Sequence, residues 1–206
     1  HISLILSKVS KEDEVMVPTI TYIASVNAIK YVGANPIFMD TEEDLNISVE
    51  KVNKFFAEET YLKKGYTHNK RTNKRISAII VVHTMGNAAD IKPLIKTCKK
   101  RRIKVIEDAA ESLGTVYSKK YFRNKHTGTI GDYGCLSFNG NKIITSAGGG
   151  AILTNTKKKY LLGNYLCDQA KDDSIYSIHN NIGYNYKLSN IQSALGCAQL
   201  KKLKNF

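Results

Sequence analysis

Short apolar runs alternate along the chain with segments in which apolar residues recur at helical spacing. Runs rich in β-branched residues and bounded by turn formers predict strands over residues 14–17, 36–39, 78–82, 104–107 and 151–154. Helical spacing predicts helices over residues 24–31, 49–57, 91–102 and 188–203, and the first seven residues resemble the middle of a helix. Asp90 and Ser189 are candidate N-caps, and Pro93 suits a first helical turn. The polar stretch 63–75 predicts a mobile loop.

The alternation of strands and helices predicts an α/β fold with three layers (α/β/α). A mixed, mostly parallel sheet would carry helices on both faces. Ligands of such sheets bind beyond the carboxyl ends of the strands. Polar and aromatic residues follow three of the predicted strands, in segments 18–22, 83–87 and 107–111. We therefore expect the functional site to be assembled from these segments.

The composition is that of a globular protein, with 206 residues, 42% hydrophobic and 24% charged. No apolar run approaches the ~18 residues of a membrane span, and no segment has the pattern of a signal peptide. The cysteines are too far apart for a zinc motif, and without a secretory context we expect reduced thiols. They are Cys98, Cys135, Cys167 and Cys197. A cytoplasmic protein without a metal or membrane partner is expected.

The formal net charge of +13 raises the possibility of a nucleic-acid partner. The basic runs, however, are scattered over segments predicted to be loops and helix ends. They contain neither a base-stacking aromatic motif nor a helix-turn-helix pattern. Solvated surface is the favoured interpretation, so no nucleic-acid partner is expected. A phosphorylated ligand gains from the positive field in either case.

Two residues are candidates for chemistry, although each has a simpler interpretation. Asp108 follows an apolar strand, where a carboxylate needs a cationic or strongly donating partner such as a protonated pyridine nitrogen. Taken alone, its segment favours a helix-capping role. Lys142 lies among Ser, Asn and Gly residues, where the backbone can approach a ligand closely. A partly desolvated lysine is a usable nucleophile, but an isolated lysine is more often a surface residue.

Taken together with their surrounding sequence blocks, Asp108 and Lys142 point to one protein family. Four blocks, at 13–19, 107–111, 131–142 and 183–190, match in order and spacing the DegT/DnrJ/StrS family of sugar aminotransferases. This resemblance covers essentially the whole chain. It implies the large domain of a fold-type-I transferase dependent on pyridoxal 5'-phosphate over residues 1–186, with residues 187–206 beginning a helix that leads to a C-terminal small domain. Family members extend beyond both ends, and their Gly-Thr phosphate-binding turn is expected before His1.

The resemblance also implies roles for individual residues. Lys142 would be the Schiff-base lysine and would carry the proton between cofactor and substrate carbons. Asp108 would pair with the pyridine nitrogen, Tyr22 would stack on the cofactor ring, and Ser137 would donate to its phosphate. Asn185 would reach the phosphate of the partner subunit's cofactor. A homodimer with shared active sites is therefore expected.

Two positions depart from the family pattern. Glu111 stands where many members have Gln, which donates to the phenolic oxygen of the cofactor, and a carboxylate there would repel that oxygen. Lys187 stands where Arg is common, so bidentate binding of an anion is lost. His83 and His179 are candidates for the side of the cleft that receives a sugar nucleotide.

The implied activity is amino-group transfer from an amino acid, with glutamate expected, to a nucleotide-linked 4-keto-6-deoxy sugar for surface glycans. Segments 126–132 and 169–173 resemble the branch that acts on UDP-linked 4-keto sugars of the legionaminic-acid or bacillosamine type. One alternative is the dehydratase branch of the family, which carries His at the lysine position, so Lys142 argues against it. The other alternative is a regulatory protein or a basic nucleic-acid-binding protein, and only the net charge supports it.

Overall fold

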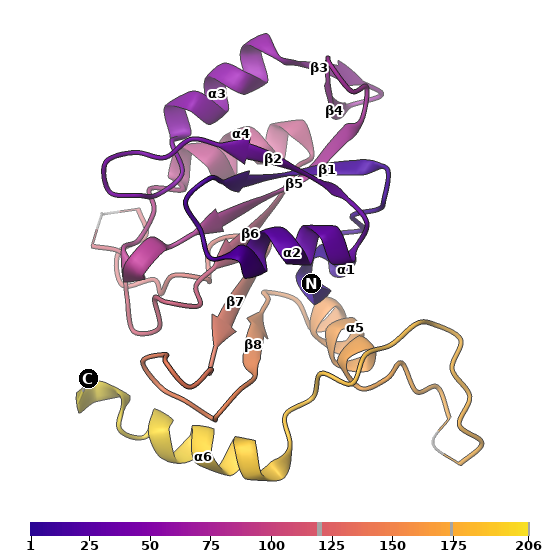
Figure 1. The fold of residues 1–206 in the computed structure, drawn as a ribbon, viewed down its shortest axis with the longest axis vertical. Helices are drawn as coiled ribbons and strands as arrows, with labels where there is room; N and C mark the ends of the chain where they lie inside the picture. Colours follow the sequence, from indigo (N-terminus) through magenta and orange to yellow (C-terminus); the bar gives the residue numbers. More distant parts are fainter. Residues whose placement is uncertain (119–120, 174, 206) are drawn as a thin grey trace.

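An eight-stranded sheet runs through the computed structural model, which describes residues 1–118, 121–173 and 175–205 (Figure 1). Six strands lie in the order β2-β1-β5-β6-β7-β8, where β1 spans Asp13–Pro18, β2 Asn35–Met39, β5 Arg75–Val82, β6 Lys104–Asp108, β7 Tyr133–Ser137 and β8 Gly150–Leu153. The first five strands of this order pair in parallel, whereas β8 is antiparallel to β7. The sheet is mixed and mostly parallel, as predicted.

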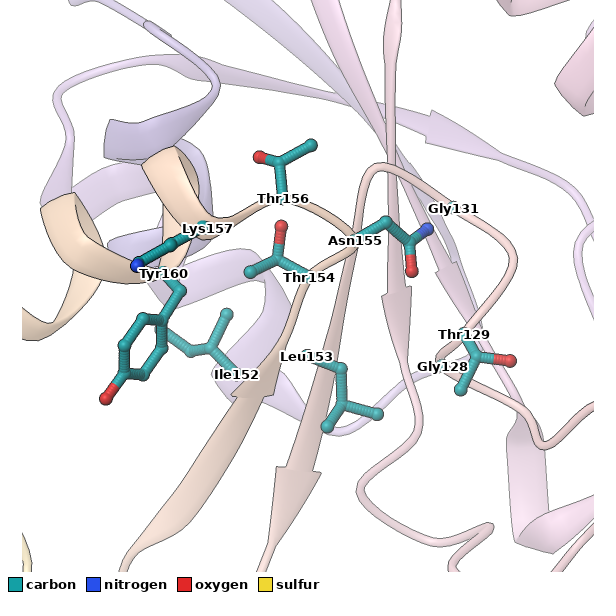
Figure 2. Close-up of a pocket in the computed structure, with 10 residues that line it drawn as sticks. All are labelled: Gly128, Thr129, Gly131, Ile152, Leu153, Thr154, Asn155, Thr156, Lys157 and Tyr160. Carbon is teal, nitrogen blue, oxygen red and sulfur yellow. The ribbon is translucent and has the colours of Figure 1, made fainter.

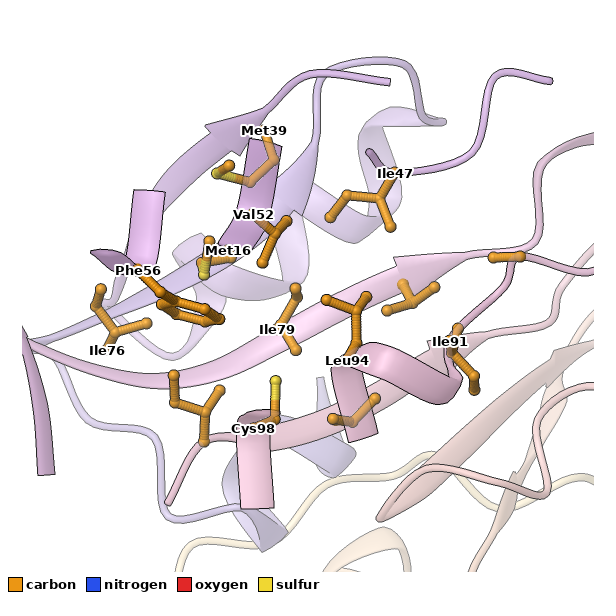
Figure 3. Close-up of a cluster of buried hydrophobic side chains, with 14 of the residues drawn as sticks. Met16, Met39, Ile47, Val52, Phe56, Ile76, Ile79, Ile91, Leu94 and Cys98 are labelled. Atoms are coloured by element: carbon orange, nitrogen blue, oxygen red, sulfur yellow. The ribbon is translucent and has the colours of Figure 1, made fainter. Parts of the chain in front are cut away.

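Helices cover both faces of this sheet (Figure 1). Their bounds are α1 Ile2–Leu6, α2 Ile23–Tyr31, α3 Val49–Glu58, α4 Lys92–Arg101, α5 Lys157–Cys167 and α6 Asn190–Leu200, with 3₁₀ turns at Thr84–Gly86 and Leu203–Asn205. Successive strand residues point to opposite faces, so Ile79 joins a core cluster with residues of α3 and α4, whereas Ile80 joins one with α1 and α2. Figure 3 shows the first cluster, in which Phe56, Leu94 and Cys98 pack over the strands. The predicted α/β/α layering is confirmed.

The predicted strands and the helices over 24–31, 49–57, 91–102 and 188–203 are present within a few residues of their expected bounds. Ser189 caps α6 in a capping box with Gln192. The expectation that Asp90 caps α4 is wrong, since the N-cap is Ile91. Ile91 is fully buried and its carbonyl accepts the Ile95 N–H at 2.9 Å, so core packing determines where this helix begins. Pro93 lies in the first turn, as predicted.

The interpretation of 63–75 as a loop is wrong for much of that segment. It contributes to an antiparallel hairpin of β3 (Thr60–Lys63) and β4 (Tyr66–Asn69). Lys64 and Gly65 both have positive φ, which suits a tight two-residue hairpin turn. Thr67 and Asn69 are buried, and the Asn69 side chain donates to Glu14 Oε2 at 2.9 Å. These strands were not predicted because their buried residues include polar side chains, which gain hydrogen-bond partners only in the folded protein.

Helix α5 was not among the predicted elements. Helix α5 begins after Thr156, whose side chain accepts from the Lys159 N–H. Helix α6 buries none of its residues in this chain. No helix in the described part is long and apolar enough to span a membrane. The four cysteines are free, and no cluster of potential metal ligands occurs among the described residues.

Candidate active site

A cavity of about 590 Å³ opens at the carboxyl ends of the parallel strands. Its walls include the last residues of β5, β6 and β7, namely Val82, Asp108 and Ser137, together with the start of α2 and the segment before Lys142. The cavity therefore lies where ligands of open α/β sheets bind. Five of the predicted site residues line it: Tyr22, Asp108, Glu111, Ser137 and Lys142.

Asp108 is the last residue of β6, and its carboxylate is held from two sides. Ser25 Oγ donates to Oδ2 at 2.5 Å, and the Ala110 N–H donates to Oδ1 at 3.1 Å. No helix follows within described residues 109–118, which removes the helix-capping alternative. An oriented, half-buried carboxylate on a cavity wall is suited to accept a hydrogen bond from a cationic ligand group.

Lys142 lies in the connection between β7 and β8. The Phe138 N–H donates to Gly149 O at 2.9 Å, which closes this connection at its base. Within it, the Lys142 N–H donates to Asn139 O at 3.1 Å. The Lys142 side chain is only 17% exposed, unlike that of a typical surface lysine. The amine is thus sheltered and faces the cavity that Asp108 also lines.

Glu111 uses both carboxylate oxygens within the protein. Oε2 accepts the Met85 N–H at 2.9 Å, and Oε1 lies 3.5 Å from Lys142 Nζ. Met85 adopts a left-handed conformation, with φ of 51°, in the turn that follows β5. The backbone of this turn and the Lys142 amine therefore hold the Glu111 carboxylate in place. Many members of the family have the amide of Gln at this position.

Tyr22 and Ser137 offer an aromatic face and a hydroxyl to the same cavity. Tyr22 is the N-cap residue of α2 and is 76% exposed. Ser137 Oγ accepts the Asn139 N–H at 3.4 Å, so its own proton is available for another acceptor. An exposed aromatic ring can stack on a planar ligand, and the hydroxyl can donate to an anion.

His83 does not line the cavity. It is fully buried, its Nδ1 accepts the Ala89 N–H at 3.2 Å, and its Nε2 lies 2.9 Å from Glu107 Oε2. Because Nδ1 is an acceptor, the ring proton is on Nε2 and is donated to Glu107. The His83–Glu107 hydrogen bond links the end of β5 to β6 next to the cavity. A direct contact of His83 with substrate stays a prediction.

The other candidates lie in the segment that leads to α6. His179 and Asn185 are exposed, and the His179 ring Nδ1 lies 2.9 Å from Gln169 O. Lys187 Nζ forms an ion pair with Asp168 Oδ2 at 2.9 Å. None of the three lines the cavity of its own chain. Their predicted roles toward a substrate or a partner subunit remain predictions.

The sequence did not indicate several residues that line the cavity. Ser25 lies within the predicted helix 24–31, and only the tertiary structure brings it to Asp108, 83 positions away. Thr84 and Met85 lie in the polar segment after a strand, which pointed to the region without singling them out. Asn139 and Asn141 precede Lys142 in the block that carries the family resemblance, and their place in that block is the signal that could have identified them.

A second hollow lies beside the start of α5, with Thr154, Thr156, Lys157 and Tyr160 on one side and Gly128, Thr129 and Gly131 on the other (Figure 2). Lys157 is its one charged lining residue. It brings together no carboxylate and amine, so the candidate chemistry belongs to the cavity that contains Asp108 and Lys142.

Comparison with known proteins identifies the class to which this fold and site belong. Residues 1–206 match the model of the DegT/DnrJ/EryC1/StrS aminotransferase family, and the chain belongs to that family. Among curated relatives, EpsN of Bacillus subtilis, named as a pyridoxal phosphate-dependent aminotransferase, is 38% identical over 98% of this chain. The GDP-perosamine synthase of Escherichia coli O157:H7 is 40% identical over 100% of it.

Solved structures give the same fold. An aminotransferase of this family from Brucella abortus superposes with a TM-score of 0.87 at 26% identity, covering 99% of this chain and 51% of that one. Helicobacter pylori PseC, an aminotransferase in pseudoaminic acid biosynthesis, superposes with a TM-score of 0.82 at 27% identity and the same coverage. The chain spans 49% and 51% of the two curated relatives, about half their length.

The side chains around the main cavity fit pyridoxal phosphate. The sheltered amine of Lys142 can react with the cofactor's aldehyde, and the fixed carboxylate of Asp108 can pair with its pyridine nitrogen. The exposed ring of Tyr22 can stack on the face of the cofactor ring. The Ser137 hydroxyl has a proton to donate to its phosphate. A volume of about 590 Å³ lies within the ~300–1,000 Å³ of small-ligand pockets.

Proposed function

We propose that the protein is a pyridoxal-phosphate-dependent transaminase that transfers an amino group from an amino acid, glutamate being the expected donor, to a nucleotide-linked 4-keto-6-deoxy sugar. The observation that carries this proposal is the presence of Asp108 and Lys142 on the walls of one cavity. Family membership supports the reaction class. Lys142, where the dehydratase branch has His, favours transamination over dehydration.

The bound cofactor supplies an electron sink for negative charge that develops on a substrate carbon. Asp108 would accept a hydrogen bond from the protonated pyridine nitrogen and so favour its protonated form, while Ser25 and Ala110 fix the carboxylate. Lys142 Nζ would hold the cofactor through its aldehyde and would carry a proton to and from the reacting substrate carbon. Tyr22 would restrain the cofactor ring, and Ser137 would donate a hydrogen bond to its phosphate.

The substrate class rests on the relatives and on charge. GDP-perosamine synthases and PseC are named for amino-sugar biosynthesis, which supports a sugar acceptor. A net charge of +13 favours an anionic substrate such as a nucleoside diphosphate sugar. We keep the UDP-linked sugar of the legionaminic-acid or bacillosamine type as the specific proposal and surface glycan synthesis in the cytoplasm as its setting.

The test uses the full-length protein reconstituted with cofactor. A protonated Schiff-base absorbance band that L-glutamate bleaches, and that a 4-keto sugar nucleotide restores, is the expected result. Lys142→Ala should abolish the band and the transfer, whereas Lys158→Ala, which removes an exposed lysine outside the cavity, should change neither. Normal transfer by Lys142→Ala would refute the mechanism. Comparison of UDP- and GDP-linked 4-keto-6-deoxy sugars then identifies the nucleotide.

We also propose that residues 1–186 form the cofactor-binding large domain and that the protein acts as a homodimer with shared sites. Two observations support this: Asn185 is exposed outside its own chain's cavity, and α6 buries none of its residues. A dimer in which Asn185 serves the partner's site can be tested by complementation. Co-expressed Lys142→Ala and Asn185→Ala chains should recover about a quarter of wild-type activity, since half the dimers are mixed and each has one intact site. No recovery would place Asn185 in its own chain's site.

A further inference from the structure

We propose that a second cavity, at the amino ends of the parallel strands, binds a small anion that carries a diphosphate group. This cavity has a volume of about 620 Å³ and is lined near the starts of β5 and β6 by Arg75 and Lys104. The candidate active site lies at the opposite edge of the sheet. Lys104 and Asp108 mark the two ends of β6, about 13 Å apart at the rise of an extended strand. The proposal is independent of the transamination.

The cavity gathers more positive charge than the protein neutralises. Its cationic lining residues are Lys8, Arg75, Lys99, Arg102, Lys104 and Lys159. Two carboxylates oppose these six cations. Asp13 binds Arg75 at 2.5 Å, and Asp132 is shared by Lys104 at 2.7 Å and Lys159 at 3.7 Å. Across the described part of the chain, Lys8, Lys99 and Arg102 have no carboxylate partner. Like charges gathered in a concave surface favour an anionic ligand.

Two guanidinium groups of this cavity are held in place by one aromatic ring. Arg102 is the C-cap residue of α4 and has a left-handed conformation, and its guanidinium carbon lies 5.1 Å from the centroid of the Tyr66 ring. The guanidinium carbon of Arg75 lies 5.6 Å from the same centroid. Such cation–π contacts restrict the arginines without using up their hydrogen-bond donors. Arg75 already donates from Nε and Nη2 to Asp13, at 2.8 and 2.5 Å. The Arg102 fork donates to no other described residue, and its planar donors match the oxygens of a phosphate group.

Two serines in the walls point to the same ligand chemistry. Ser7 and Ser77 are only 9% and 5% exposed, and both line this cavity. Their hydroxyls have no hydrogen-bond partner among the described residues. A buried hydroxyl without a partner is costly and uncommon in folded proteins. A phosphate group bound against this wall would offer these hydroxyls the acceptor that the free protein lacks.

The size and charge of the cavity favour a diphosphate over a single phosphate and over a polyanion. A volume of about 620 Å³ lies within the ~300–1,000 Å³ range of small-ligand pockets. The excess of cations over carboxylates suits a group with several negative charges. A nucleic acid, in contrast, would need a basic surface that extends along its backbone, whereas these cations converge on one hollow.

Isothermal titration calorimetry of the full-length, cofactor-loaded protein with inorganic pyrophosphate, at constant ionic strength, tests the proposal. We expect one site per chain. Lys99→Gln and Arg102→Gln should each weaken binding about tenfold, because each removes a charge-assisted contact. Lys100→Gln is the matched control, since it removes the same charge from an exposed neighbour on α4 that does not line the cavity.

Further variants separate this cavity from the active site. Lys142→Ala should bind pyrophosphate normally. Ser77→Ala should weaken binding while leaving folding stability unchanged or higher, since it removes a hydroxyl that the free protein leaves without a partner. Absence of binding, equal affinity in the Lys99 and Lys100 variants, or loss of binding in Lys142→Ala would each overturn the proposal. Orthophosphate bound as tightly as pyrophosphate would overturn the assignment to a diphosphate.

Discussion

Ser25 Oγ donates a hydrogen bond of 2.5 Å to Asp108 Oδ2, joining the first turn of α2 to the end of β6. Ser25 is buried, so this donor is not exchanged for water. The Ala110 N–H holds the second carboxylate oxygen. Together these bonds set the plane of the carboxylate on the cavity wall, which makes Ser25 a positioning residue for the proposed contact with the cofactor nitrogen.

Ser25→Ala should therefore weaken cofactor binding without unfolding the protein. A hydrogen bond to a charged group contributes about 1.5–3 kcal/mol, so the cofactor dissociation constant should rise roughly ten- to a hundredfold. Absorbance titration of the apoprotein measures the change. Ser25→Thr retains the hydroxyl and should restore most of the affinity. If Thr is as damaging as Ala, the effect comes from packing in α2 and not from the hydrogen bond.

Glu107 stabilises the region under the site through four hydrogen bonds. Oε1 accepts the Ile130 and Gly131 N–H groups at 2.7 and 2.5 Å, and Oε2 accepts the Gly128 N–H and the His83 ring, both at 2.9 Å. Burial raises the pKa of this carboxyl, but the bonds from His83 and the backbone outweigh burial. The pKa of Glu107 therefore lies below its usual value.

The lowered pKa of Glu107 determines how its contribution to folding stability depends on pH. A carboxyl with a lowered pKa stabilises the fold above the ordinary glutamate value of about 4.3, and the contribution is lost as pH falls through the lower pKa of the folded state. Glu107→Gln places an amide donor against N–H donors and should cost about 2–4 kcal/mol at pH 7. Urea unfolding should show this difference narrowing below pH 4. The exposed control Glu12→Gln should show no such loss at pH 7.

The parts of the fold that the sequence predicted are those with strong local patterns. The β-branched runs of β1, β5 and β6 and the amphipathic spacing of α3 and α4 specify their elements locally. The hairpin of β3 and β4 was missed because Asn69 and Thr67 gain buried partners only in the folded chain. Likewise, Asp108 and Lys142 were recognisable in their blocks, whereas Ser25 depends on a contact that spans 83 positions.

Gly149 is a position in the Lys142 connection that should not tolerate a side chain. Its φ is +87°, and an added Cβ would lie 2.1 Å from Leu188 Cδ2, just before α6. Gly149→Ala should cost about 1–3 kcal/mol through backbone strain and crowding. Gly140→Ala in the same connection is the control, because an added Cβ there meets no atom within 4 Å. Thermal unfolding should therefore distinguish the two variants, and equal melting temperatures would contradict the crowding at Leu188.

Glu111 presents a carboxylate to a cavity that fits an anionic cofactor. Glu111→Gln retains an oxygen for the Met85 N–H but removes the negative charge beside Lys142. The side chain is 41% exposed, so water screens the repulsion, and we expect cofactor binding to tighten only about threefold. Equilibrium dialysis of the apoprotein with pyridoxal phosphate measures the change, with the exposed Glu42→Gln as a charge-matched control. A several-fold loss of affinity instead would show that the carboxylate holds Lys142 in the position the cofactor requires.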